Sequence, residues 1–274
     1  MTKEDASTWD RVQQGVESVR REMATVIVGQ EGIVEEMLVC LLCRGHCLII
    51  GVPGLAKTLL VSTLGHILGL SFHRIQFTPD LMPMDILGSE ILQEQAGGPR
   101  AFEFSPGPVF AHLILADEIN RTPPKTQAAL LEAMQEKQVT VSGKTRRLPD
   151  PFIVYATQNP IEHEGTYPLP EAQLDRFFFN LLIDYPSVAQ ERDIVQRTTG
   201  RDAPAPKAVL DPDSVKLLQD AVLDVPLPDH VLDYILKLVH RTRPADEMAD
   251  DYIKRYVAWG AGPRGSQNLA RAAK

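Results

Sequence analysis

The chain has 274 residues, of which 44% are hydrophobic and 23% are charged, and its formal net charge is -8. A chain of this size can bury a large core in two domains, and its negative charge argues against a dominant nucleic-acid surface, because binding a phosphate backbone requires clustered positive charge. No stretch is apolar enough for a signal peptide or a membrane span, so we expect a cytoplasmic protein.

Two helices are predicted before the first strand. Apolar residues recur at helical spacing from Thr8 to Val26, and a second helix is expected from about Glu31 to Leu42. Cys40, Cys43 and Cys47 follow at close spacing, but no fourth cysteine accompanies them and their neighbours are apolar. This pattern favours buried thiols over a metal-cluster site.

A phosphate-binding loop follows the first predicted strand, Cys47 to Ile50. Gly51 can adopt the angles of a sharp turn, and the amides that follow can receive anionic oxygens. Lys57 supplies a positive charge for the β and γ phosphates and Thr58 a hydroxyl for Mg²⁺, and leucines at helical spacing predict the helix that the motif requires. The predicted nucleotide-contacting residues of the loop are Gly51, Pro53, Gly54, Leu55, Ala56, Lys57, Thr58 and Leu59.

The loop departs from the usual pattern at the position before the lysine, where Ala56 stands in place of glycine. A methyl group is acceptable there if the residue has right-handed helical angles, since the steric penalty falls on positive φ. We therefore expect right-handed helical angles at Ala56 and interpret the loop as a phosphate-binding loop despite this departure.

The next strand is expected from Ser71 to Phe77, followed by a connection from Pro79 to Ile86 and then by a hairpin. In the second arm of the hairpin, Phe102 and Phe104 alternate with other side chains. We favour a packing role for both rings, with an exposed gripping surface as the alternative. The expected arms are Leu87 to Glu94 and Ala101 to Ser105, joined at Gly97-Gly98-Pro99.

Asp117 and Glu118 end a strand of apolar residues, Leu113 to Ala116. Such a strand is typical of a parallel sheet buried on both faces, and ligands bind at the carboxyl ends of its strands. Asp117 can hold Mg²⁺ through its water, and Glu118 can polarise an attacking water. A helix capped by the Thr122 hydroxyl, with prolines in its first turn, is expected to follow as far as Glu136.

A second hairpin is predicted around the turn Ser142-Gly143-Lys144. Its basic residues near the tip favour a solvated edge that resists aggregation, with contact to an acidic partner as the alternative. The arms are Val139 to Val141 and Thr145 to Leu148, and the basic residues are Lys144, Arg146 and Arg147.

Two further strands complete the predicted sheet. Phe152 to Thr157 brings Asn159 to the same edge as the two carboxylates, where its amide can contact the γ phosphate or orient water. The alternative for Asn159 is a turn-forming role. The last strand runs from Phe177 to Ile183, and Arg176 stands just before it.

From Pro186 onward the pattern is helical. We therefore expect residues 1–186 to form an α/β core and residues 187–274 a small all-α lid, whose last helix is cut short at Lys274. A linker is expected from Thr199 to Pro206. The predicted lid helices are Ser187 to Thr198, Pro212 to Val222, Asp229 to Thr242, Asp250 to Trp259, and one that begins at Gly262-Pro263-Arg264.

These motifs occur in the order seen in AAA+ ATPases, and the sequence resembles the MoxR family of the helix-2-insert group. The resemblance covers the chain from about Val28 to its end. It implies an α/β P-loop NTPase fold, in which a three-layer core with a parallel five-stranded sheet precedes an all-α lid. The matching segments are the phosphate loop, Asp117 to Arg121, Lys125-Thr126-Gln127, Thr157 to Pro160, and Glu171 to Phe177.

The resemblance also implies residue roles that spacing alone does not show. Asn159 would be the first sensor, and Arg176 the finger that reaches a neighbouring subunit. Arg264 would be the second sensor, which reaches the γ phosphate when the lid closes over the core. The residues implied to lie against the adenine of ATP or ADP are Val28, Gly29 and Gln30.

Members of this family hydrolyse ATP with Mg²⁺, form hexameric rings and act as chaperone-like remodelling machines. Their usual partners are proteins with von Willebrand factor A domains, and their tasks are metal-cofactor insertion or complex assembly. The two hairpins would be the helix-2 insert and the pre-sensor-1 hairpin, which line the pore of related rings. The resemblance thus implies an ATPase that acts on other proteins.

Two other functions are compatible with the sequence. A nucleic-acid motor is possible within the same group, supported by the basic hairpin and opposed by the net charge. A nucleotide-gated binding module with little turnover is opposed by the presence of every acid, amide and arginine expected for hydrolysis. DNA-stimulated, salt-sensitive ATPase activity would favour the first, and absent single-turnover hydrolysis would favour the second.

Overall fold

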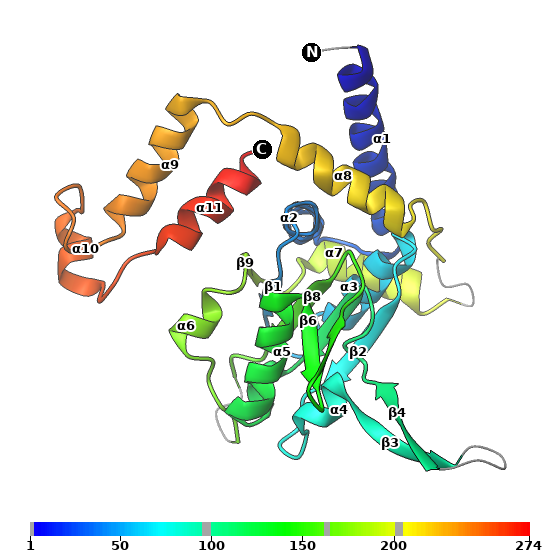
Figure 1. Ribbon diagram of the computed structural model, residues 1–274. Coiled ribbons are helices and arrows are strands. Elements are labelled where there is room, and N and C mark those ends of the chain that lie inside the picture. The colour runs from blue at the N-terminus through cyan, green and yellow to red at the C-terminus, as the bar shows by residue number, and fades with distance from the viewer. Residues whose placement is uncertain (1–2, 95–99, 162–164, 201–204) are drawn as a thin grey trace.

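The computed structural model describes residues 3–94, 100–161, 165–200 and 205–274 (Figure 1). None of the helices within these ranges is both long and apolar enough to cross a membrane. The turn at Gly97-Gly98-Pro99 and part of the predicted linker lie outside the described residues.

A five-stranded sheet forms the centre of the core, with the strand order β2-β5-β8-β1-β9 and parallel pairing throughout. This arrangement confirms the predicted α/β fold. Most strand ends lie within one residue of the predicted ends, because apolar runs bounded by turn residues are a strong strand signal. The strands are β1 (Cys47–Ile50), β2 (Phe72–Gln76), β5 (Leu113–Asp117), β8 (Ile153–Gln158) and β9 (Phe179–Leu182).

Helices cover both faces of the sheet and make a three-layer core (Figure 1). In β5, Leu113 and Leu115 pack on one face while Ile114 and Ala116 pack on the other, as the alternation of a strand requires. Both faces of the sheet are therefore buried. The covering helices are α1 (Lys3–Val26), α2 (Glu31–Leu42) and α3 (Lys57–Ile67) on the first face, and α4 (Pro83–Leu87) and α5 (Pro124–Glu136) on the second.

Two hairpins project from the core, as predicted: β3 (Gly88–Glu94) with β4 (Arg100–Pro106), and β6 (Gln138–Val141) with β7 (Lys144–Arg147). The packing role expected for both aromatic rings holds only for Phe104, whose ring lies 5.6 Å from that of Phe110. Phe102 is 69% exposed. The first hairpin therefore carries an exposed ring beyond its packed base.

The basic residues of the second hairpin are held by the first. Lys144 and Arg146 lie 3.3 and 3.7 Å from a carboxylate oxygen of Glu90, and the Arg146 guanidinium lies 3.8 Å from the centre of the Phe104 ring. The acidic partner of this tip is thus within the same chain. Arg147 remains exposed.

Three expectations about helices in the core differ from the structure. The expected connection from Pro79 to Ile86 includes α4, and a short helix, α6 (Glu171–Leu174), was not predicted. The Thr122 hydroxyl does not cap α5 but donates to the Leu81 carbonyl at 3.4 Å. Pro123 occupies the N-cap position, which leaves Thr122 one residue too early to reach the first helical amides.

Five helices follow the sheet, close to the predicted boundaries, and no described residue after β9 lies in a strand. In Figure 1, α8 lies beside α1 and α2, and α9 packs against α11, whose carboxyl end contacts Cys43 at the end of α2. Leu218 of α8 shares a small core with Val12 of α1. The boundary at residues 186 and 187 remains a prediction. The helices are α7 (Val188–Thr198), α8 (Pro212–Asp224), α9 (Asp229–Arg241), α10 (Asp251–Tyr256) and α11 (Pro263–Ala272).

The three cysteines are buried free thiols, as predicted. Burial raises the pKa of Cys40 well above its ordinary value and that of Cys43 to about 11. Among the described residues, no group of three or more metal-binding side chains occurs. These thiols therefore serve as small apolar side chains in the core.

Ala56 does not meet the condition set for it, because its φ of 55° and ψ of 24° lie in the left-handed region. It stands immediately before α3, where glycine would take these angles without a steric penalty. The expectation of right-handed helical angles is therefore wrong. The surrounding loop imposes the conformation that the usual glycine would adopt freely.

His46 joins α5 to the sheet in neutral form. Its Nε2–H donates to the Met134 carbonyl at 3.2 Å, and its Nδ1 accepts from the Val154 amide at 3.0 Å. Burial lowers its pKa to about 4. Protonation of Nδ1 would break the bond to Val154 and leave a buried charge.

Ala56→Gly should stabilise the protein by up to about 1 kcal/mol, because relief of the left-handed strain exceeds the added freedom of the unfolded chain. Denaturant unfolding measures this change. The matched control is Ala128→Gly, at an exposed position inside α5, which should destabilise by about 1 kcal/mol. If both substitutions change the free energy of unfolding in the same direction, the strain assigned to Ala56 is contradicted.

His46 should make stability depend on pH. Since its folded pKa of about 4 lies below the unfolded value of about 6.5, the unfolded state binds more protons between these limits. The free energy of unfolding should fall on the order of 3 kcal/mol more from pH 6.5 to 4 in wild type than in His46→Gln. Exposed His230→Gln should keep the wild-type slope.

Candidate active site

The candidate site lies where the carboxyl ends of β1, β8 and β5 meet. In the pairing register, Ile50 lies opposite Gln158 and Ala116 lies opposite Ala156. The phosphate loop, Asn159 and the two carboxylates therefore leave the sheet at one edge. This common edge is what the sequence predicted, because parallel strands present their carboxyl ends together.

The phosphate loop places Lys57 in the space between loop and acids. Its ammonium group donates to the carbonyls of Gly51 and Val52, the second at 3.2 Å. Partial burial lowers the pKa of Lys57, while the charges of Asp117 and Glu118 act in the opposite direction. The lysine is therefore near enough to the acids to feel their charge.

Glycines keep the loop open to a ligand. Gly54 has a φ of +87°, and a Cβ added there would meet no atom within 4 Å, so its backbone borders free space. A Cβ on Gly51 would lie 3.0 Å from the Ile183 carbonyl oxygen, so a side chain at the end of β1 would crowd the backbone after β9. Backbone amides that face open space at a helix start suit an anionic ligand.

Asp117 is 8% exposed, and both of its carboxylate oxygens have partners. The Thr157 hydroxyl donates to Oδ1 at 2.5 Å, while Arg74 donates to Oδ2 from Nη2 at 2.6 Å and from Nε at 3.0 Å. Thr157 also accepts a bond from the Glu118 amide at 2.8 Å. Neighbouring strands therefore fix the position of this carboxylate.

Glu118 has a φ of 57° and a ψ of 49°, a strained conformation for a residue with a side chain. Its Oε2 accepts from the Gln76 amide at 2.9 Å and from Arg121 at 3.0 Å. The strain and these contacts turn the carboxylate toward β2 at the edge of the site.

Sequence reasoning missed Arg74 and Gln76. Both lie on β2, two residues apart, so their side chains share one face beside Asp117. Polar residues at alternate positions of a strand were visible in the sequence. Their relevance depends on β2 pairing with β5, which only the strand order reveals.

Asn159 is buried, 4% exposed, and its Oδ1 accepts from the Ile161 amide at 3.1 Å. This bond is the turn-forming contact considered as the alternative. No described residue accepts a hydrogen bond from the amide nitrogen, so that group remains available to the site. Both interpretations of Asn159 are compatible with this geometry.

An apolar pocket adjoins the phosphate loop on the side of α7. Two of the three residues expected to contact adenine, Val28 and Gln30, line it. Gly29 between them has a φ of +73°, an angle that a residue with a side chain adopts only under strain, and a Cβ there would have to displace the Gln190 side chain. The faces of a flat aromatic base suit this pocket. Its other lining residues include Leu55, Leu59, Pro186 and Ile194.

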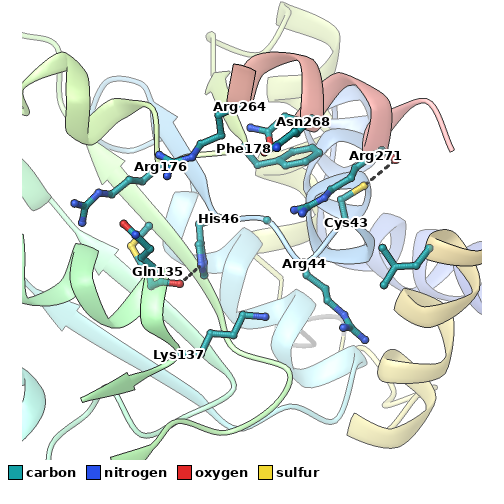
Figure 2. Close-up of a pocket in the computed structure, with 14 residues that line it drawn as sticks. Cys43, Arg44, His46, Gln135, Lys137, Arg176, Phe178, Arg264, Asn268 and Arg271 are labelled. Atoms are coloured by element: carbon teal, nitrogen blue, oxygen red, sulfur yellow. Dashed lines mark hydrogen bonds between the residues drawn. The ribbon is translucent and has the colours of Figure 1, made fainter. Parts of the chain in front are cut away.

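Arg176 and Arg264 lie in another pocket, at the amino ends of β1 and β9 (Figure 2). The Arg264 guanidinium donates to Asp175 at 2.9 Å. The length of β1, about 13 Å for its residues, separates this pocket from the phosphate loop. The structure therefore brings these two arginines together but not to Lys57.

This second pocket is strongly basic. No Asp or Glu is among the described residues that line it, and His46 contributes no charge because its pKa is low. Figure 2 shows Arg264, Asn268 and Arg271 along α11, facing the loop that carries His46. Such a pocket suits an anionic group. Its cationic side chains are Arg44, Lys137, Arg176, Arg264 and Arg271.

Comparisons with known proteins agree with this geometry. Residues 46–179 match the model of the ATPase family associated with various cellular activities (AAA). The crystal structure of a candidate ATPase from Cytophaga hutchinsonii superposes with a TM-score of 0.88 at 40% identity, over 98% of this chain and 82% of that one. The match includes both the α/β core and the helices that follow it.

Relatives of known sequence extend the match beyond the core. The chain is 47% identical over 253 residues to Chaperone MoxR1 of Mycobacterium tuberculosis, covering 92% of this chain and 66% of that protein. It is 44% identical to YeaC of Bacillus subtilis and 32% identical to Protein MoxR of Paracoccus denitrificans, in each case over 77% of the relative. The chain therefore belongs to the MoxR family of AAA+ ATPases.

Proposed function

We propose that the protein binds and hydrolyses ATP with Mg²⁺ and uses the energy to remodel partner proteins. The observation that carries the proposal is the meeting of Lys57, Asp117 and Glu118 at one sheet edge, beside an apolar pocket. This combination suits a nucleotide, whose flat aromatic base can pack against apolar side chains and whose phosphates are anionic.

Each residue would have a distinct task. Lys57 would offset the charge of the β and γ phosphates, and Thr58 and Asp117 would hold Mg²⁺, which supplies further charge neutralisation when bound. Oxygen donors of this kind suit that ion, and Asp117 is already oriented by Thr157 and Arg74. Glu118 would take up a proton from the attacking water, and the Asn159 amide nitrogen would orient that water or the γ phosphate.

Arg176 and Arg264 would act on the nucleotide of a neighbouring copy. Both lie at the sheet edge opposite their own phosphate loop, in a pocket whose described lining residues include no Asp or Glu. Arg264 was expected to reach its own γ phosphate when the lid closes. Its contact with Asp175, beside Arg176, favours a shared role at the interface.

We further propose a hexameric ring whose clients include proteins with von Willebrand factor A domains. The name of the Mycobacterium relative, a chaperone, supports action on proteins. The tasks would be complex assembly or metal-cofactor insertion in the cytoplasm. The nucleic-acid alternative loses support because Lys144 and Arg146 contact Glu90 of the same chain.

Lys57→Ala should lose ATP binding, whereas Glu118→Gln should bind ATP as wild type does and fail to hydrolyse it. The first removes the cation that offsets the triphosphate, and the second removes only the carboxylate that receives the proton. Equilibrium binding and single-turnover hydrolysis separate the two effects. The exposed Lys237→Ala serves as the charge control. Equal loss of binding in both site variants would refute these roles.

Arg176→Ala and Arg264→Ala should each keep most ATP affinity and lose turnover, by as much as about 10³-fold for an arginine finger. Mixing either variant with Glu118→Gln should restore activity, because some interfaces then combine an intact Glu118 with intact arginines. Activity should fall again on dilution. If Arg264→Ala shows no recovery in rings where Arg176→Ala recovers, Arg264 acts within its own subunit.

A further inference from the structure

Gln127, in the first turns of α5, ties together two chain segments through one amide group. It is fully buried, and its Nε2 lies within hydrogen-bond distance of the carbonyls of Ile119 at 3.2 Å, Thr122 at 3.1 Å and Tyr167 at 2.9 Å, so its two hydrogens are shared among three acceptors. Its Oε1 has no hydrogen-bond partner among the described residues. The side chain is thus held by its donors alone, and all three acceptors are backbone groups.

The two segments are the turn after Glu118 and the chain that leads to Arg176. Besides accepting from Gln127, Tyr167 donates its own amide to the Asn120 carbonyl at 2.6 Å. Both backbone polar groups of Tyr167 are therefore bonded either to the Glu118 turn or to the glutamine that holds that turn. A shift of the turn would carry Tyr167 with it.

Apolar packing extends this attachment along Tyr167–Arg176, which we term the finger segment. Leu169 near its start and Phe177 just after it are 7% and 5% exposed, and both belong to the core cluster that includes Ile119. The finger segment includes α6 and ends at Arg176. The finger segment is therefore anchored near its two ends to the same core as the Glu118 turn, whereas no residue of α6 between these anchors is buried.

The other side of the finger segment contacts the carboxyl-terminal helices. Arg264 pairs with Asp175, and the Trp259 indole donates to Glu171. The segment thus lies between the Glu118 turn and the helices that carry Arg264. A movement of its anchor at Tyr167 would reach the arginine pocket directly.

We propose that Gln127 is a positioning residue that couples the Glu118 turn of one subunit to the Arg176 that the same subunit offers to its neighbour. The inference rests on the proposed function, since it requires Arg176 to act across an interface. Gln127 itself touches no reacting group. Its contacts with the three carbonyls make the position of the finger segment depend on the position of the Glu118 turn in the same subunit.

Gln127→Met tests the coupling, because methionine has a similar length and no donor, so the three carbonyls lose their shared partner. The matched control is Gln219→Met. Gln219 is equally buried, donates to the Leu41 carbonyl at 2.7 Å and accepts from Arg44 at 3.3 Å, but among the described residues it has no hydrogen bond to the Glu118 turn, the finger segment, Arg176 or Arg264. Gln127→Asn, which keeps the donors on a shorter side chain, is the second variant if methionine prevents folding.

Alone, Gln127→Met should bind ATP within about twofold of wild type and lose turnover on the order of 10- to 100-fold, as expected for a misplacement of about 1 Å. Gln219→Met should lose little turnover. Hydrogen exchange should show faster exchange across residues 165–177 in Gln127→Met and Gln127→Asn, with β5 unchanged. Unchanged exchange in that segment would overturn the proposal.

Mixed rings identify the residue through which Gln127 acts. If it acts through Arg176, Gln127→Met should recover activity with Glu118→Gln, which lends an intact finger, and should not recover with Arg176→Ala. Recovery with Arg176→Ala but not with Glu118→Gln would show that Gln127 acts on the Glu118 of its own subunit. No recovery with either variant would indicate that Gln127 has a structural role only. Both results overturn the inference.

The parent mixture of Arg176→Ala with Glu118→Gln separates this inference from the proposed function. Recovery in the parent mixture together with failure of the Gln127→Met mixture rejects the coupling alone. Failure of the parent mixture in rings shown to be mixed rejects the action of Arg176 across an interface, and the coupling with it.

Discussion

The parallel pairing of β1, β8 and β5 is the constraint on which the rest of the molecule depends. It directs the phosphate loop, Asn159 and the two carboxylates out of the sheet at one edge. Burial of both faces keeps that pairing in register, because a one-residue slip would exchange the side chains of the two faces. The positions of the candidate catalytic groups are therefore a consequence of core packing.

The same pairing places a second group of charges at the opposite edge. β1 and β9 begin beside the basic pocket, so Arg176 and Arg264 are separated from Lys57 by the length of the strands. A protein built in this way carries its phosphate-binding groups and its arginines on different sides. This separation is the physical reason to expect that a complete site requires a second copy.

Buried polar side chains connect these parts. Thr157 bonds to the Asp117 carboxylate and the Glu118 amide, and Gln127 bonds the turn after Glu118 to Tyr167. Both side chains are fully buried, where an unsatisfied polar group is costly, so the segments they join have few alternative arrangements. Movements in one part of the site should be transmitted through these contacts.

The sequence by itself determined the five strands, the helices after them and the residues of the phosphate-loop edge, because apolar runs, turn residues and local motifs depend on near neighbours in the chain. Only the tertiary structure revealed Arg74 and Gln76 beside the acids, the contact of Glu90 with the second hairpin, and the pocket shared by Arg176 and Arg264. It also decided the left-handed angles of Ala56, against a local steric preference. Each of these features depends on which distant segments pack together, and no local pattern encodes that.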